Sequence, residues 1–289
     1  MYGRNKNARL LTGGIVGASS GTTGRRGLGS VPTALFATLD PTEVSETGLT
    51  FSPDNLQVSG GGHTSWRGVR SDFSIPDNGK VYYEWVNPTG AELTMVGVTT
   101  TVPSSTSWYP GLDANSWGAF QFSAQSYDLG WYHQANVTGH TDANYTVPAY
   151  AVGMVAVDRS TGKIHYGIDG QWWTSTTTLG TFQAYTVFTN IPSTGALYPA
   201  ISSIYANNMQ YDGVLNFGQD HTFAGKKTAL VTPYTDANGL GEFYYEPPAG
   251  FTGLYTTIPT PLRTRGYIGA APAQGGMLTL YDRYIDNLT

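Results

Sequence analysis

Residues 163–174 read KIHYGIDGQWWT, and this short stretch indicates a β-hairpin. Its central Asp169-Gly170 pair tolerates the positive φ angles that a two-residue hairpin turn requires, and apolar residues flank the pair on both sides. Trp172 and Trp173 are adjacent, so a strand points them to opposite faces. We therefore expect one of these two rings to be exposed.

Outward from this hairpin the sequence continues as short strands separated by turns. Residues 81–86 place Val81, Tyr83 and Trp85 on one face, and an Asn-Gly pair at 238–239 predicts a second hairpin. Further β-branched or aromatic runs lie at 93–99, 118–123, 151–157, 184–189 and 214–217. No stretch keeps a helical period over three turns. Strands at this spacing predict an all-β protein, a sandwich of two antiparallel sheets.

The composition agrees with a globular β protein. The chain has 289 residues, of which 40% are hydrophobic and only 12% are charged, with 37 Gly and 16 Pro. Long surface helices normally need more Glu, Lys and Arg than this. The absence of Cys excludes disulfides, zinc–thiolate sites and Cys nucleophiles. No apolar run approaches the roughly 20 residues that cross a bilayer, and no signal-peptide core is present, so we expect neither a membrane span nor a secretory signal.

The net charge of −5 conceals an asymmetry along the chain. Residues 1–39 carry five basic side chains and no acid, while the other 250 residues carry 10 basic and 20 acidic ones. The basic residues are Arg4, Lys6, Arg9, Arg25 and Arg26. Such a Gly-rich segment buries too little apolar surface to order itself alone. Five charges without interleaved aromatics make a weak nucleic-acid footprint, so we expect docking onto another protein subunit.

Three parts of the chain follow from these patterns. Residues 1–47 are expected to form an extended basic docking arm, and residues 48–260 the β-sandwich. Residues 261–289 follow a Pro-rich break and are too short for a domain. We expect them to act as a second docking segment or as a strand added to a neighbour.

A series of short motifs resembles the SPRY domain. In chain order they are GKVYYE (79–84), VGV (96–98), SWG (116–118), VAVD (155–158), GKIHY (162–166), YPAI (198–201), LNFGQD (215–220) and PPAGF (247–251). The opening LTFS (49–52) and SWRGVR (65–70), and the closing TGLY (252–255), are more similar to SPRY-type domains of bacteriophage structural proteins than to animal ones. The resemblance covers roughly residues 48–260, with an insertion between Phe223 and Pro247.

The resemblance implies a bent sandwich of the concanavalin A-like type. Such a domain binds through loops, has no catalytic machinery and needs no cofactor. It also implies a virion as the location, assembled in the host cytoplasm, with other virion proteins as partners and a homo-oligomer on the particle.

The sequence distinguishes candidate core aromatics from candidate binding residues. Trp85, Trp117, Phe217 and Phe251 lie in strand or turn motifs and are predicted to be core. The predicted binding residues lie in turn-rich segments and at strand ends, where exposed rings beside polar groups suit sugar faces or protein partners. They are Trp108, Tyr109, Asp113, Asn115, Trp131, Tyr132, His133, Trp172 and Trp173. The alternative is that these rings cap the open ends of the sandwich.

A catalytic interpretation finds little support in the sequence. Glu242 and Glu246 share a face of a predicted strand but are about 13 Å apart there, too far for a glycosidase pair. A pair made by folding, such as Glu84 with Asp158, stays open. The five His show no metal-ligand spacing. Residues 236–242 imitate the start of a calcium loop but lack its later ligands, so a hairpin turn is favoured.

Two functions of different classes remain. The first is a non-enzymatic virion structural protein, namely a capsid decoration, collar or tail-accessory subunit. The second is a lectin-like tail fibre or spike module that recognises host surface glycan. The chain has no heptads or repeats that would form a fibre shaft, which favours the first function.

Overall fold

A computed structural model describes residues 33–60, 64–86, 94–105, 107–121, 130–137, 150–174, 179–182, 188–206, 209–210 and 212–258. These residues form strands, turns and loops and include no helix. They therefore also contain no helix long and apolar enough to cross a membrane. The predicted all-β class is confirmed.

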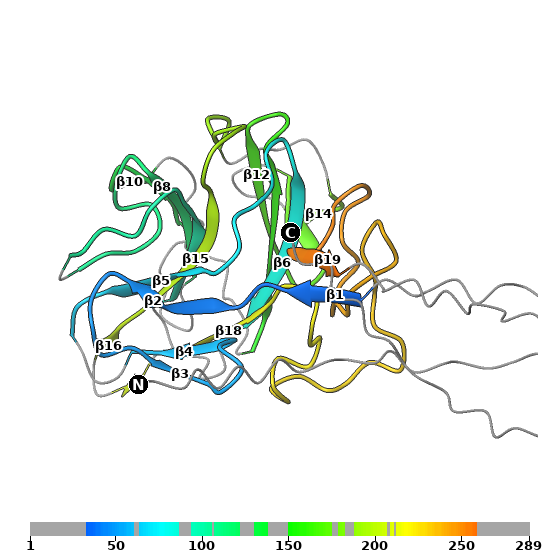
Figure 1. Cartoon of the computed structure of the whole chain (residues 1–289), viewed down its shortest axis with the longest axis horizontal. Helices are drawn as coiled ribbons and strands as arrows, with labels where there is room; N and C mark the ends of the chain where they lie inside the picture. Colours follow the sequence, from blue (N-terminus) through cyan, green and yellow to red (C-terminus); the bar gives the residue numbers. More distant parts are fainter. Residues whose placement is uncertain are drawn as a thin grey trace, which may run out of the picture. The chain divides into compact units, whose positions relative to one another are not determined.

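Two antiparallel sheets make up the body (Figure 1). The seven-stranded sheet has the order β10-β9-β8-β7-β15-β5-β2 and the eight-stranded sheet the order β14-β13-β12-β11-β6-β18-β4-β3. The first sheet consists of β2 (Leu39–Val44), β5 (Arg67–Ser71), β7 (Thr94–Thr99), β8 (Ser116–Gln121), β9 (Gly130–His133), β10 (Asn136–Val137) and β15 (Tyr198–Ser203). The second consists of β3 (Thr50–Phe51), β4 (Gln57–Ser59), β6 (Lys80–Val86), β11 (Val152–Asp158), β12 (Lys163–Ile168), β13 (Gln171–Trp173), β14 (Leu179–Gly180) and β18 (Asp212–Asn216).

The two sheets pack face to face around one core. On β6, Val81, Tyr83 and Trp85 point into this core, as their alternation predicted, while Tyr82 packs on the outer face. The Tyr83 hydroxyl crosses the sandwich and donates a 2.7 Å hydrogen bond to the Gly97 carbonyl of the other sheet. The four predicted core aromatics are all buried: Trp85, Trp117, Phe217 and Phe251.

The central hairpin forms as predicted. β12 and β13 pair antiparallel, with Ile168 opposite Gln171, and the φ angles of Asp169 and Gly170 are 46° and 79°. At 238–239 the chain also reverses, but only Tyr234 and Phe243 pair across the turn. The expected second hairpin is thus a single bridge within a loop.

This loop, residues 219–254, covers the outer face of the eight-stranded sheet. Phe243 has no exposed surface and packs against Tyr82, with ring centroids 5.1 Å apart. The central strand β11 is therefore covered on both faces, which explains why every residue of β11 is buried.

Two short two-stranded ladders lie outside the two large sheets. β1 (Thr33–Phe36) pairs antiparallel with β19 (Tyr255–Ile258), so that Thr33 lies opposite Ile258 (Figure 1). β16 (Tyr205–Ala206) and β17 (Met209–Gln210) form a separate small ladder.

The predicted arm boundary at residue 47 is wrong. β1 and β2 lie within residues 33–44 and pair with strands of the body. Ala37 and Leu39 are buried in the sandwich core, and this burial anchors the segment. Residues 1–32 and 259–289, called the flanking segments below, lie outside the described residues, as do Arg4, Lys6, Arg9, Arg25 and Arg26.

Candidate functional site

The loop of residues 107–115 is fixed against the turn between β9 and β10. Ala135 donates its backbone N–H to the Gly111 carbonyl at 3.0 Å, and Gln134 donates to the Asp113 carbonyl at 3.2 Å. Gly111 has a φ of 98°, and a Cβ there would lie 2.5 Å from the Tyr132 carbonyl oxygen. Glycine is therefore required for the loop to approach β9 this closely.

Three half-buried rings meet where this loop touches the sheet. Tyr109 lies between Trp66, at 5.4 Å between ring centroids, and Tyr132, at 6.2 Å. We call these three residues the rim patch. Partial burial raises the pKa of Tyr109, so its hydroxyl stays protonated at neutral pH. Asn115, on the same loop, is exposed. The structure thus brings together two of the predicted binding residues, Tyr109 and Tyr132, and adds Trp66.

Trp66 was missed as a binding candidate because it directly precedes a predicted strand within a motif that resembles a structural one. The contact of its ring with Tyr109 becomes visible only in the folded structure.

Trp108 and Asp113 have structural roles, contrary to the binding prediction. Trp108 has no exposed surface, and its ring lies where a Cβ on Gly68 would be, 2.2 Å from that position. Its indole N–H donates to the Asp113 carboxylate at 2.9 Å. The same carboxylate accepts hydrogen bonds from the Asn115 N–H and the Ser116 hydroxyl. Asp113 is therefore occupied in holding its own loop.

His133 is likewise held by its neighbours. Its ring stacks on Trp117, with centroids 4.9 Å apart and planes 6° from parallel. Its Nδ1 lies 2.8 Å from the Ser116 carbonyl oxygen, which only a protonated Nδ1 can satisfy as donor. Asn190 bridges the pair, accepting from the Trp117 indole at 2.9 Å and contacting His133 Nε2 at 3.4 Å.

The expected exposure of Trp131, Trp172 and Trp173 is wrong. Trp131 and Trp173 meet in the core at 5.9 Å between centroids, and each tryptophan of the three exposes 5% or less. Trp172 and Trp173 do point to opposite faces, but the outer face that holds Trp172 is covered. Tyr82 and Phe182 pack against its ring.

An outer pocket of about 380 Å³ lies beside this covered tryptophan. Its aromatic walls are Trp172, Phe182, Tyr234 and Tyr245. Phe182 and Tyr234 are 36% and 45% exposed, so the walls are open to solvent. Among the described residues that line this pocket, Glu246 alone carries a charge. Apart from Trp172, the sequence does not indicate the walls of this pocket, because they come from separate segments, namely β13, residues 181–182 and the insertion.

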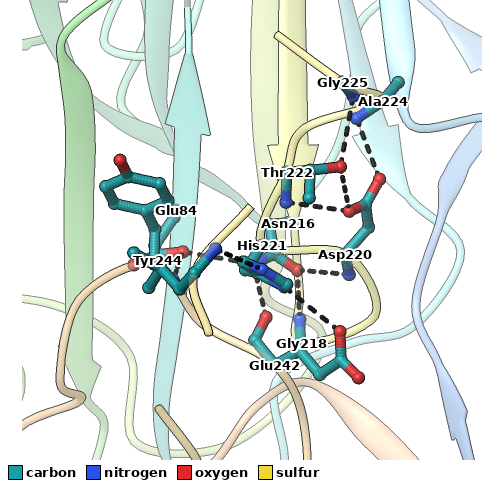
Figure 2. A network of polar contacts seen from close by, with 11 residues as sticks. Glu84, Asn216, Gly218, Asp220, His221, Thr222, Ala224, Gly225, Glu242 and Tyr244 are labelled. Carbon is teal, nitrogen blue, oxygen red and sulfur yellow. Dashed lines mark hydrogen bonds and ion pairs between the residues drawn. The ribbon is translucent and has the colours of Figure 1, made fainter. Parts of the chain in front are cut away.

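A buried polar network attaches the insertion to the sheet (Figure 2). The Glu84 carboxylate, with no exposed surface, accepts hydrogen bonds from the backbone N–H groups of Tyr244 and Tyr245 at 2.9 and 2.7 Å. It also accepts from the Tyr82 hydroxyl at 2.9 Å and from Asn216 Nδ2 at 3.1 Å. Burial raises the pKa of Glu84 to about 7, although these four hydrogen bonds act to lower it.

The same network continues through Asn216 and the start of the insertion (Figure 2). Asn216 Oδ1 accepts from the N–H groups of Gly218 and Asp220, and its Nδ2 also donates to the Glu242 carbonyl at 2.8 Å. His221 Nε2 accepts the Leu230 N–H at 3.1 Å, so Nδ1 carries the proton that faces Glu242 at 3.2 Å. Every polar group here has a structural partner.

The carboxylates are not arranged for hydrolysis. Glu84 lies opposite Met154 and Asp158 opposite Lys80, so the two acids are separated by four residues of strand, about 13 Å. Asp158 forms an ion pair with Lys80 at 2.9 Å, and hydrogen bonds from Ser160 and Lys80 lower its pKa despite some burial. The pair left open by the sequence is therefore not a catalytic pair.

The turn at 236–240 has no calcium-loop geometry. Asp236 Oδ1 accepts the N–H groups of Asn238 and Leu240, both at 2.9 Å, and Oδ2 accepts that of Gly253 at 2.9 Å. Within the described ranges no group of three or more His, Asp or Glu side chains could hold a metal ion.

No family model matches the sequence, and no curated protein matches it. Among solved structures, the chain is similar to the SPRY domain of human HERC1, with 14% identity and a TM-score of 0.42 over 61% of this chain and 96% of that one. It is also similar to another human SPRY domain, with 13% identity and a TM-score of 0.40 over 58% of this chain and 94% of that one.

Proposed function

We propose that this chain is a non-enzymatic structural protein of a bacteriophage virion, a decoration, collar or tail-accessory subunit. Its flanking segments hold it to the particle, and its sandwich is displayed. The observation that carries this proposal is the β1–β19 ladder, which pairs the first described strand of the chain with the last one.

The pairing of Thr33 with Ile258 favours a single partner surface for both flanking segments. Thr33 and Ile258 are directly opposite each other, so residues 1–32 and 259–289 leave the body at adjacent positions. Two segments with one origin gain avidity when both engage the same neighbour. The five positive charges within residues 1–39, without any acid, suit an acidic protein surface.

The virion context rests on the sequence motifs. The opening at 49–52 and 65–70 and the closing at 252–255 resemble bacteriophage SPRY-type domains. The absence of catalysis is supported by the polar side chains themselves: Glu84, Asp113 and Asp158 are each committed to hydrogen bonds or an ion pair of the fold.

Deletion of residues 1–31 is the direct test. We expect the truncated chain to keep its sandwich, because β1 and the core begin after this segment, and to fail to join its particle. Deletion of residues 260–289 should act in the same direction. Normal incorporation of both truncated chains would contradict the proposal.

A glycan-binding role is the second candidate, favoured by the rim patch. Partly exposed Trp66, Tyr109 and Tyr132 beside Asn115 offer flat apolar area with a polar rim. A patch this small predicts weak single-site affinity, near millimolar, on the order of 4 kcal/mol, that many copies on one particle would raise by avidity.

A glycan array probed with the multivalent full chain tests this role. Binding that is lost on Tyr109→Ala and kept by Tyr150→Ala, a matched exposed tyrosine, would support it. No binding by the unaltered chain would leave the purely structural role, and release of reducing ends from a polysaccharide would overturn the non-enzymatic proposal.

A further inference from the structure

The outer pocket has the chemistry of a cation site. Its walls are the rings of Trp172, Phe182, Tyr234 and Tyr245, and aromatic faces carry partial negative charge. Glu246 adds a full negative charge, is exposed, and takes part in none of the ion pairs among the described residues. A cation is attracted both by ring faces and by a carboxylate.

Neighbouring rings on this face already hold cations. Lys227 Nζ lies 5.0 Å from the Tyr244 ring centroid, and Lys80 Nζ lies 5.8 Å from that of Phe251. Neither lysine lines the pocket. The described lining of the pocket therefore has aromatic rings and one carboxylate, Glu246, and no basic side chain.

The size of the pocket restricts the occupant. A volume of about 380 Å³ is at the small end for ligand sites, which span roughly 300–1,000 Å³. It accommodates one long side chain with its neighbours. Glu246 and Tyr245 are consecutive and come directly before the Pro247-Pro248 pair, which stiffens this wall of the pocket.

The charge distribution of the chain indicates which group would bind in the pocket. Five Arg and Lys residues lie within residues 4–26 without any acid, while the rest of the chain has a net charge of −10. Complementary charge of this kind steers association and selects partners.

We propose that the outer pocket of one copy receives an arginine or lysine side chain from residues 1–31 of a second copy. This inference rests on the proposed function, since it names the acidic surface that the basic segment engages. It makes the assembly a contact between copies of this chain.

The test uses a full-length receptor chain in which Arg4, Lys6, Arg9, Arg25 and Arg26 are all replaced by Gln, so that its own segment does not compete. A peptide of residues 1–31 is titrated onto this chain by calorimetry at low salt. We expect saturable binding that weakens as salt screens the charges. The peptide with the same five replacements should not bind.

Pocket variants of the receptor locate the binding. Glu246→Gln and Tyr234→Ala should each weaken peptide binding about tenfold, and Tyr150→Ala, with the same 45% exposure as Tyr234, should not change it. Equal melting temperatures of the three variants exclude unfolding as the cause. Binding that the pocket variants leave unchanged would overturn the inference, as would no binding of the peptide.

A further measurement separates this inference from the proposed function. Incorporation into particles is compared for the five-residue Gln variant and for Glu246→Gln. If only the Gln variant fails to incorporate, the flanking segment docks elsewhere, the inference is wrong and the proposed function stands. If both variants incorporate normally, the basic side chains are not needed for docking. The inference and the charge-based part of the proposed function are then both wrong.

Discussion

Trp117 shows how one side chain links the core to the rim. Its ring is 3% exposed, its indole N–H donates to Asn190, and His133 stacks on its face. Trp117→Ala removes both the packing and the support of His133. We expect unfolding free energy to fall by about 3–5 kcal/mol. Urea unfolding measures this, with Tyr150→Ala as the exposed control, and an unchanged midpoint would show that the ring is not core.

Glu84 makes the stability of the fold depend on pH. Its pKa rises from 4.5 to about 7 on folding because the carboxyl is buried. A raised pKa means that the folded state binds the proton more tightly. The stabilising contribution of the protonated carboxyl is fully present below pH 4.5. It is lost as the pH rises through 7, which lowers the free energy of unfolding by about 3 kcal/mol.

Glu84→Gln isolates this effect. The amide cannot accept all four hydrogen bonds that the carboxylate accepts, so the variant should be less stable by about 1–3 kcal/mol. It should also lose the pH dependence. The test is the difference in unfolding free energy between the two chains from pH 4.5 to pH 8. A difference that stays constant, or that grows with pH, would contradict the assigned pKa.

For individual residues, the sequence predicts the burial of some tryptophans in strands but not that of Trp108 in a loop. Trp85 and Trp117 belong to alternating strands, and the period alone assigns them to the core. Trp108 lies in a loop with no period, and its burial depends on Gly68, which is distant in sequence and leaves room for the ring. Neither residue indicates the other in the sequence.

At the scale of elements, the β1–β19 ladder joins the first and the last described strands of the chain. Ala34 and Thr257 are register partners, and directly opposite residues have Cβ atoms about 4.5–5.5 Å apart, near disulfide range. The chain has no Cys, so a double variant Ala34→Cys, Thr257→Cys can form only one intramolecular disulfide. We expect it to form under mild oxidation and to leave particle incorporation unchanged.

Leu35→Cys with Thr257→Cys is the matched control, since a shift of one residue points the two thiols to opposite faces. Mass spectrometry after blocking free thiols reports the disulfide in each case. Equal cross-linking of both pairs, or of neither, would mean that the ladder does not have this register.

The elements predicted best are those with local signals. The 163–174 hairpin follows from Asp169-Gly170 alone, and β6 from its alternation. β1 was included in the arm because a four-residue strand has no readable period and its partner, β19, is the last described strand in the sequence. The insertion was noted as a departure from the SPRY pattern, but its role in covering the sheet depends on Glu84 and Asn216, which are buried acceptors and donors from other strands.

At the scale of the whole molecule, the charge asymmetry and the pairing of Thr33 with Ile258 support the proposal that a particle holds this subunit through its flanking segments. The rim patch and the outer pocket are the surfaces proposed above for further contacts. Of the predicted binding residues, Tyr109 and Tyr132 are half-buried and Asn115 is exposed, so their binding role stays a prediction, whereas Trp108, Trp131, Trp172 and Trp173 are buried in the fold. Sequence patterns cannot show which rings the insertion and the loops cover.

We propose above that this chain is a component of an assembled particle. Mass spectrometry of density-purified particles, combined with low-resolution imaging of particles with and without the chain, measures this most directly. We expect many copies per particle and extra density at the particle surface, on the shell or tail, that disappears when residues 1–31 are deleted. Purified particles that lack the chain, with the protein found only free in the host cell, would contradict it.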